Sequence, residues 1–282
     1  GSQGAPPPAK AELNTPSITK GKAGSPYAIT DYYDVDPDLA VHPDKRMAEF
    51  EALVARTHTA GPKGIIDFVP NHVSREYHSA CRPKGVDDLG QNDHSEWAFS
   101  PLNNFYYIPG EAFSPSFDTG GYHEYPARVT GNDCFTAHPS VNDWYETVKL
   151  NYGVYYRGGG EKQFDPIPDT WRKMCEILLF WAGKGVDAFR VDMAHMVPVE
   201  FFDWAIHRVR AVFPNVQFIA EIYEPAIYHR YIDAGFDYLY DKVGMYDYLR
   251  GVTSRDYSAD GITYQWQAAG DILDHMLYFL EN

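Results

Sequence analysis

Two acidic residues of this chain directly follow short apolar runs. Asp192 ends the run DAFRVD at 187–192, and Glu221 follows the apolar residues 218–220. One ionised carboxylate and one carboxyl group held protonated are the pair that cleaves a glycosidic bond. Arg190, two residues before Asp192, favours the charged form and so predicts a low pKa for Asp192. Apolar neighbours suit Glu221 to the part of proton donor. We therefore expect Asp192 as nucleophile and Glu221 as acid/base.

Other polar residues also lie at the ends of apolar segments. Asp67, Asn71 and His72 lie in the run DFVPNH at 67–72, which ends another apolar segment. Taken singly, a strand-end Asp is usually a helix N-cap, and Arg190 with Asp192 could form a simple ion pair. In a βα barrel, however, the functional residues lie at the carboxyl ends of the strands. Convergence at one barrel mouth explains these residues together better than capping does.

Strands and helices alternate in the pattern that such a site requires. Apolar residues recur at helical spacing in three segments, and five short apolar runs read as buried strands. Strands alternating with helices predict a parallel sheet with helices outside it. The helical segments are 47–54, 171–181 and 202–212, and the strands are 64–69, 186–191, 216–220, 236–240 and 276–280.

The periodicity is lost over residues 73–165, which are rich in Asn, Asp, Gly, Pro, Tyr and His. A structureless loop of that length is uncommon in a compact domain, so we interpret it as an inserted subdomain. The predicted organisation is a flexible entry segment at 1–23, a first barrel part at 24–72, the insertion at 73–165 and a second barrel part at 166–282.

Composition narrows the function classes. Lys and Arg number 24 against 39 Asp and Glu, and nucleic acids and anionic membranes are bound through clustered positive charge. We therefore expect no nucleic-acid or membrane partner. The three cysteines form no C-x-x-C pattern and predict neither a zinc site nor a disulfide framework, although one bridge remains open. No apolar run suits a transmembrane helix or a signal peptide. The compartment, cytoplasmic or secreted, and the oligomeric state stay unassigned.

At this point the chain resembles the α-amylase family, glycoside hydrolase family 13. DFVPNH at 67–72, DAFRVD at 187–192 and the Glu of FIAEIYEP at 218–225 are similar to the first three signature regions of that family, in the same order. Residues 24–33, GSPYAITDYY, resemble the segment after its second barrel strand. The resemblance implies a (β/α)8 barrel with a subdomain inserted after the third strand.

The resemblance also implies roles for single residues. Asp192 matches the nucleophile and Glu221 the acid/base, while Arg190 matches the residue that positions the nucleophile. His72 matches a residue that hydrogen-bonds the reacting sugar, and Tyr27 the tyrosine that stacks under it.

The remaining comparisons with the family concern structure, calcium and a further sugar contact. Asp67 is expected to hold the site together, and Asn71 matches a calcium ligand of many members. Lys149 stands where members often have an Asp that ligates the ion, and an ammonium has no lone pair for a metal. Members often have Lys-His at the third and fourth positions after Asp192, where this chain has His195 and Met196. His195 is a candidate for contact with a sugar on the reducing side, although a His satisfied by backbone is the simpler explanation. No cofactor is needed for the chemistry, and calcium remains a candidate.

The end of the sequence departs from the family pattern. Residues 278–282 resemble the start of the fourth region, which in the family continues to a third catalytic Asp, and the first two strands are not readable before residue 24. We therefore expect an incomplete barrel, an internal portion of a larger enzyme.

The expected function is retaining hydrolysis of α-1,4-glucans or malto-oligosaccharides. Transglycosylation, or formation of trehalose from maltose, is the alternative within the enzyme class. A catalytically silent fragment that binds carbohydrate or protein is the alternative outside it.

Overall fold

The computed structural model of the protein describes residues 18–20 and 24–277. The predicted entry segment at 1–23 therefore lies outside the described residues except for 18–20, and the fourth-region resemblance at 278–282 lies outside them altogether. The chain divides into two compact units. One contains residues up to Pro62 together with Asn71–Gly185, and the other contains Lys63–Pro70 together with the residues from Val186 onward. Each unit is described by itself.

The second unit is built on a parallel sheet of five strands in the order β1-β8-β9-β10-β11. The register sets Asp67 beside Arg190 and Val191 beside Ala220. Residues that follow β8 and β9 therefore leave the sheet at the same edge. The strands are β1 (Ile65–Phe68), β8 (Ala188–Val191), β9 (Gln217–Ala220), β10 (Tyr238–Tyr240) and β11 (Met276–Leu277).

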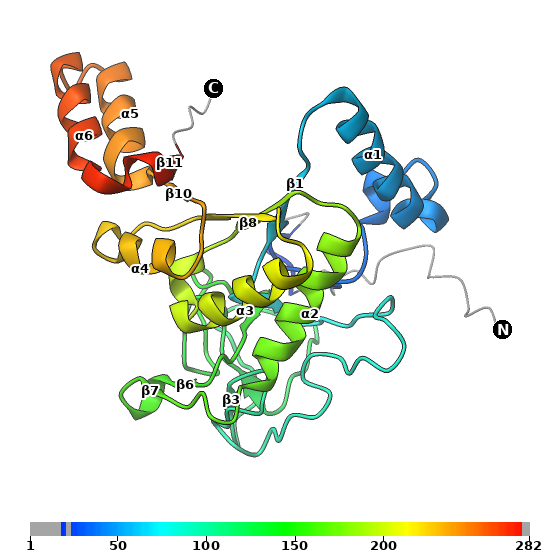
Figure 1. Ribbon diagram of the computed structural model, residues 1–282. Helices are drawn as coiled ribbons and strands as arrows, with labels where there is room; N and C mark the ends of the chain where they lie inside the picture. The colour runs from blue at the N-terminus through cyan, green and yellow to red at the C-terminus, as the bar shows by residue number, and fades with distance from the viewer. Residues whose placement is uncertain (1–17, 21–23, 278–282) are drawn as a thin grey trace. The chain divides into compact units, whose positions relative to one another are not determined.

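Phenylalanine rings fill the interior of this unit. Phe189 on β8 lies 5.6 Å from Phe218 on β9, centroid to centroid, and Phe202 on α3 lies 5.0 Å from Phe236. Buried aromatic rings remove large apolar areas from water, which favours folding. In Figure 1 the yellow helices α3 and α4 lie beside one another on one side of β8 and β10.

The helices of this unit follow the strands closely along the chain. The α-helices are α3 (Val199–Val212), α4 (Tyr228–Asp233), α5 (Asp247–Thr253) and α6 (Ile262–Ala268). The shorter helical turns are η4 (Ala194–Met196), η5 (Pro225–Ile227), η6 (Lys242–Tyr246), η7 (Ala259–Gly261) and η8 (Gly270–His275).

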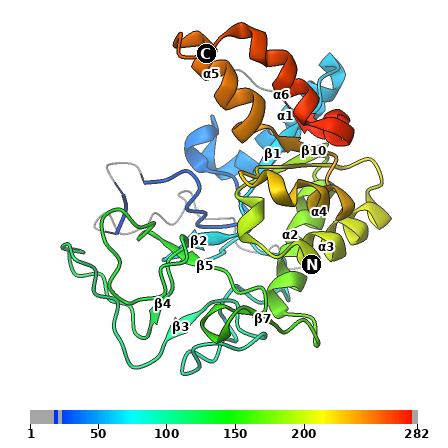
Figure 2. The same cartoon turned by 90° about the vertical axis from the view of Figure 1, so that its left-hand side faces the viewer.

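The first unit combines two long helices with short antiparallel strand pairs, β2 with β5, β3 with β4 and β6 with β7. Figure 2 shows β2 and β5 side by side. Its helices are η1 (Pro37–Leu39), η2 (Pro43–Lys45), α1 (Arg46–Ala60), η3 (Tyr156–Gly158) and α2 (Asp169–Gly183). Its strands are β2 (His72–Ser74), β3 (Tyr107–Ile108), β4 (Ala127–Arg128), β5 (Thr147–Lys149), β6 (Val154–Tyr155) and β7 (Glu161–Lys162).

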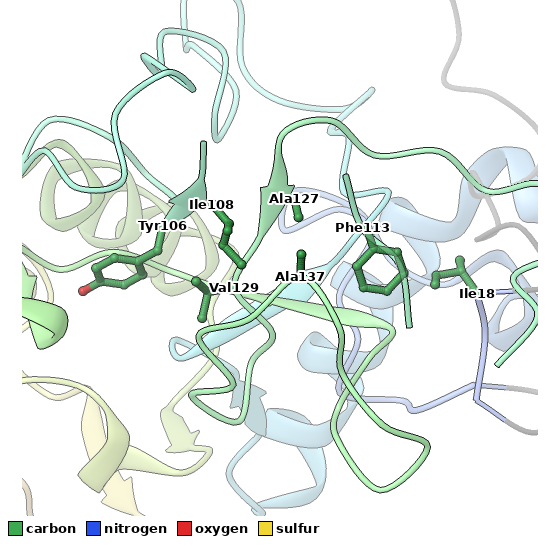
Figure 3. Packing of buried hydrophobic residues seen from close by; sticks show 7 residues of the cluster. All are labelled: Ile18, Tyr106, Ile108, Phe113, Ala127, Val129 and Ala137. Atoms are coloured by element: carbon green, nitrogen blue, oxygen red, sulfur yellow. The ribbon is translucent and has the colours of Figure 1, made fainter. Parts of the chain in front are cut away.

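Side-chain clusters stabilise residues 73–165, the stretch whose sequence lacks periodicity. Figure 3 shows seven buried apolar residues of the first unit, with the methyl groups of Ala127 and Ala137 pointing toward each other. A charged cluster lies in the same stretch. Glu124 accepts from Arg75 at 2.7 Å and from Arg128 at 2.8 Å. A buried pair of this kind is costly to break, because either partner alone would be an uncompensated charge.

The structure confirms the predicted α/β class, the five strands and the three helical segments within the described residues. Helix α1 ends at Ala60, and the next residue, Gly61, has a φ of 99°, in the left-handed region that glycine adopts readily. Closure into a barrel and the insertion at 73–165 stay predictions, since the compact unit that contains 73–165 also takes in both of its flanks. No helix among the described residues is long and apolar enough to span a membrane.

Candidate active site

The carboxyl ends of β1, β8 and β9 bring four of the predicted site residues together. The backbone N–H of Asp192 donates to the carbonyl of Phe68 at 2.9 Å, which extends the pairing of β8 with β1 by one residue. In the same way, the N–H of Glu221 donates to the carbonyl of Val191 at 3.0 Å. Both acidic residues are therefore positioned by strand pairing, and both are buried.

Arg190 links the carboxylates of the three strand ends. Its guanidinium nitrogens lie 3.2 Å from Asp67, 2.9 Å from Asp192 and 2.7 Å from Glu221. The fork of N–H donors in arginine suits several carboxylates at once. Burial opposes the charge, but Glu221, Asp67 and Asp192 together raise the pKa of Arg190 above its ordinary value. Arg190 thus stays cationic and fixes the spacing of the acidic groups.

The protonation of Asp192 differs from the sequence-based expectation. Burial raises its pKa, the neighbouring Glu221 carboxyl raises it further, and the result is about 7. Arg190 acts in the predicted direction and lowers the pKa, but burial and Glu221 outweigh it. The prediction of a low pKa for Asp192 was therefore wrong, because it left out desolvation and a second carboxyl in direct contact.

Two groups that contact Glu221 were missed by the sequence analysis. The hydroxyl of Tyr223 donates to Glu221 Oε1 in a short hydrogen bond, and the N–H of Met193 donates to Oε2 at 3.0 Å. Burial and the adjacent Glu221 raise the pKa of Tyr223 above its ordinary value, so the hydroxyl remains a donor. Tyr223 lies two residues after Glu221, and the same spacing argument that joined Arg190 to Asp192 would have indicated it.

Met193 supplies its N–H from a strained backbone position. Its φ and ψ are both 45°, in the left-handed region that residues other than glycine rarely adopt. Strain of this kind persists where the surroundings impose it, and it is frequent at functional sites. Here it turns the chain between β8 and η4 so that the N–H faces the Glu221 carboxylate.

His195 lies on η4 in the same unit. Its ring is 5.7 Å from the ring of Tyr223, centroid to centroid. Its Nδ1 atom is buried and has no hydrogen-bond partner among the described residues. The simpler explanation, a histidine whose nitrogens bond to the backbone, therefore does not hold for Nδ1. Contact with a sugar stays a prediction for His195.

Tyr27, Asn71 and His72 belong to the first unit. Burial lowers the pKa of His72, and the nearby Lys149 ammonium lowers it further, to about 4, so the ring is neutral at pH 7. The His72 ring makes a hydrogen bond to the backbone of Tyr27, which joins two of the predicted sugar-binding residues. About a third of the Tyr27 surface is exposed, as a ring that stacks on a ligand requires.

Asn71 does not fit the part of a calcium ligand. Its side-chain oxygen accepts a hydrogen bond from Lys149 Nζ at 2.8 Å, and its amide nitrogen donates to the carbonyl of Gly131 at 2.8 Å. Calcium binds oxygen atoms with free lone pairs. An ammonium at the only side-chain oxygen of Asn71 competes directly with an ion.

Asp34 and Cys81 line a cavity of about 670 Å³ in the first unit. Together with Asp31 they bring carboxylate oxygens and a thiol sulfur close to one another, and these are atoms that can bind a metal ion. The Asp34 carboxylate accepts from Arg46 at 2.7 Å, and Asp31 accepts from Ser79 at 2.6 Å. These hydrogen bonds account for the group as a structural network, and the sequence analysis had not singled it out.

The chain is similar to a known protein family and to several known proteins. A family model described as "Alpha amylase, catalytic domain" matches residues 14–229. The α-1,4-glucan:maltose-1-phosphate maltosyltransferase of Cereibacter sphaeroides is 27% identical over 85% of this chain and 34% of its own length. The amino acid transporter heavy chain SLC3A1 of Homo sapiens is also 27% identical, over 85% of this chain and 30% of its own. The chain thus spans about a third of the length of these relatives.

Solved structures agree at the level of the fold. A crystal structure of an α-amylase from Lactobacillus plantarum is 24% identical, with a TM-score of 0.55 over 89% of this chain and 48% of that chain. The cyclic α-maltosyl-(1→6)-maltose hydrolase of Arthrobacter globiformis has a TM-score of 0.58 at 18% identity in its complex with maltose, over 89% of this chain and 47% of that one.

Proposed function

The chain belongs to the α-amylase family, and on that premise we propose that it carries the catalytic carboxylates of a retaining α-glycosidase acting on α-1,4-glucans or malto-oligosaccharides. The observation that carries this proposal is the single guanidinium of Arg190, which joins Asp192, Glu221 and Asp67 at three neighbouring strand ends. The complexes of similar structures with maltose and with acarbose support the substrate class.

The first step uses one charge and one proton. Burial and the nearby Glu221 carboxyl raise the pKa of Asp192, and two acid groups in such close contact release their protons in separate stages. The first step requires the singly protonated form in which Asp192 is the carboxylate and Glu221 is the carboxyl. The proton that burial favours on Asp192 therefore has to pass to Glu221 before the attack. The Asp192 oxygen bonds to the anomeric carbon, the glycosidic C–O bond breaks, and the Glu221 proton passes to the leaving oxygen.

The second step reverses the exchange. An acceptor hydroxyl attacks the anomeric carbon, its proton passes to the Glu221 carboxylate, and the bond to Asp192 breaks. The donors on Glu221 suit this step, because Tyr223, Met193 and Arg190 all stabilise the carboxylate before it takes up the proton. Two inversions at the same carbon give retention.

Transglycosylation is the second candidate, and the similarity to a maltosyltransferase favours it. The two reactions share the first step and differ only in the acceptor, which is water in one case and a sugar or phosphate in the other. The strand-end carboxylates serve both equally.

A catalytically silent fragment is the candidate from outside the enzyme class. The similarity to an amino acid transporter heavy chain favours it, since the name of that protein gives it no glycosidase activity. Against this candidate stand the paired acid groups and the arginine that holds them, a costly buried arrangement that binding alone does not need.

The test is incubation of the purified 282-residue chain with maltoheptaose, with products followed by mass spectrometry and proton NMR. We expect cleavage with an α-anomeric product, lost in Asp192→Asn and kept in Asp203→Asn, an exposed Asp on α3. Elongated products would select transglycosylation. Equal cleavage by the two variants would contradict the assignment of Asp192 as nucleophile. No reaction by the folded chain would contradict the proposal and favour the silent alternative.

A further inference from the structure

A buried ammonium lies beside the predicted sugar-binding histidine. Lys149 is the last residue of β5 and pairs with His72, the first residue of β2. Its side chain is only 2% exposed, and its Nζ lies 2.6 Å from Asp133 Oδ1 and 2.8 Å from Asn71 Oδ1. The ring centroid of Tyr156 lies 5.4 Å from the same nitrogen. A buried lysine keeps its charge only where such partners compensate it.

These contacts settle how the Asn71 amide is oriented. Lys149 Nζ can only donate, so the Asn71 atom facing it is the oxygen. The carbonyl of Gly131 can only accept, so the atom facing it is the amide nitrogen. The usual ambiguity between the oxygen and nitrogen of an amide is therefore removed by chemistry.

The amide in turn sets the state of the His72 ring. Asn71 Nδ2 lies 3.1 Å from His72 Nδ1 and has a second hydrogen to donate. Nδ1 must then accept, and the ring proton of neutral His72 lies on Nε2. The ring is packed in place by Trp144, 5.2 Å away between centroids, and hydrogen-bonds to the backbone of Tyr27.

We propose that the Lys149 ammonium takes the place of a divalent cation at Asn71 and, through the Asn71 amide, holds His72 in its Nε2–H tautomer. Lys149 is thus a positioning residue for the pair His72 and Tyr27. That this pair meets a sugar rests on the proposed function. The occupation of the Asn71 oxygen by the ammonium, and the tautomer, follow from the contacts of the first unit alone.

The charge balance of the site agrees with this. The Asp133 carboxylate sits at 2.6 Å from Nζ and supplies one negative charge, which matches one ammonium. Calcium takes about six to eight oxygen ligands, with affinity that rises with their charge. Replacing the ammonium by a carboxylate would leave Asp133 and Asn71 facing a third oxygen donor, so two carboxylates and an amide oxygen would become available to a calcium ion.

The first experiment measures the tautomer of His72. The chain is labelled with ¹⁵N at histidine, and His72 is assigned by the signal lost in His72→Gln. We expect the ring nitrogens of His72 in the unsubstituted chain to show protonation at Nε2 only. Lys149→Met should bring in the other tautomer, whereas Lys149→Arg, which keeps the charge, should not.

Lys173→Met is the matched control. Lys173 is also buried and donates to an asparagine oxygen, that of Asn104, at 2.9 Å. Its loss should destabilise the chain without changing the His72 signals. An Nδ1–H tautomer in the unsubstituted chain would overturn the proposal, as would equal effects of Lys149→Met and Lys173→Met.

The second experiment tests the cation by thermal unfolding with Ca²⁺ or with EDTA. We expect neither to move the melting temperature of the unsubstituted chain. Breaking the buried pair in Lys149→Met should lower it by roughly 10 °C, with no recovery on adding Ca²⁺. Lys149→Asp should be stabilised by Ca²⁺. A fall in the melting temperature of the unsubstituted chain in EDTA would overturn the proposal.

Both experiments run without substrate. A chain that fails to cleave maltoheptaose but shows the expected tautomer and calcium response would refute the proposed function and leave this inference standing. A chain that cleaves maltoheptaose but lacks the expected tautomer and calcium response would refute this inference and leave the proposed function standing.

Discussion

Replacing the nucleophile should stabilise the folded chain above neutral pH. Burial and then Glu221 raise the pKa of Asp192 from 3.8 to about 7. A raised pKa means that the folded chain binds this proton more tightly than the unfolded chain does. The resulting stability is fully present below about pH 4 and is lost as the pH rises through about 7. A difference of about three pH units corresponds to about 4 kcal/mol of unfolding free energy. Asp192→Asn removes the charge and keeps the shape, so it should regain up to that amount.

The assay is urea unfolding of the unsubstituted chain and of Asp192→Asn from about pH 5 to about pH 8. Over this range, proton linkage at Asp192 changes the unfolding free energy of the unsubstituted chain by about 3 kcal/mol. We expect Asp192→Asn to be the more stable protein, by a margin that is smallest at the acidic end and largest at the basic end. Asp203→Asn, on an exposed face of α3, should follow the unsubstituted chain throughout. A less stable Asp192→Asn above pH 7 would show that the ion pair with Arg190 outweighs burial, and would refute the reasoning.

Three further substitutions each test a contact within one of the two units. Tyr223→Phe removes a hydrogen bond to the Glu221 carboxylate, and since such a bond contributes about 1.5–3 kcal/mol, kcat/KM on maltoheptaose should fall by roughly 10- to 100-fold. Arg190→Lys replaces a fork that reaches three carboxylates by a point charge, so kcat should fall by about 100-fold or more, and an unchanged kcat would contradict the bridging role. Gly131→Ala would place a methyl group 2.9 Å from His72 Cβ, so urea unfolding should show a loss of about 1–3 kcal/mol.

The strand-end residues were predictable because sheet geometry makes them converge. Apolar runs marked β1, β8 and β9, and the parallel pairing of these strands places Asp67, Arg190, Asp192 and Glu221 at one edge. No long-range information beyond the alternation of strands and helices was needed. The protonation of Asp192 was not predictable in this way, because desolvation depends on every neighbour of the carboxyl and not only on Arg190, two residues away.

The contacts of Lys149 lay beyond the reach of local patterns. The sequence showed that a lysine at this position disfavours calcium, but Asp133 and Asn71 meet Lys149 through the pairing of β2 with β5 and a loop between them. The stretch from 73 to 165 has no period from which such pairing can be read, since its short strands and side-chain clusters are set by tertiary contacts.

The most direct test of the central claim is to trap the covalent intermediate on Asp192. Glu221→Gln is mixed with α-maltosyl fluoride, whose leaving group needs no proton, so the first step proceeds while the second lacks its base. Intact-mass and peptide mass spectrometry then locate the added group. The account predicts one maltosyl unit on the peptide that contains Asp192, and none in Glu221→Gln combined with Asp192→Asn. A folded Glu221→Gln chain without the adduct, or with the sugar on another residue, would contradict the assignment of Asp192 as nucleophile.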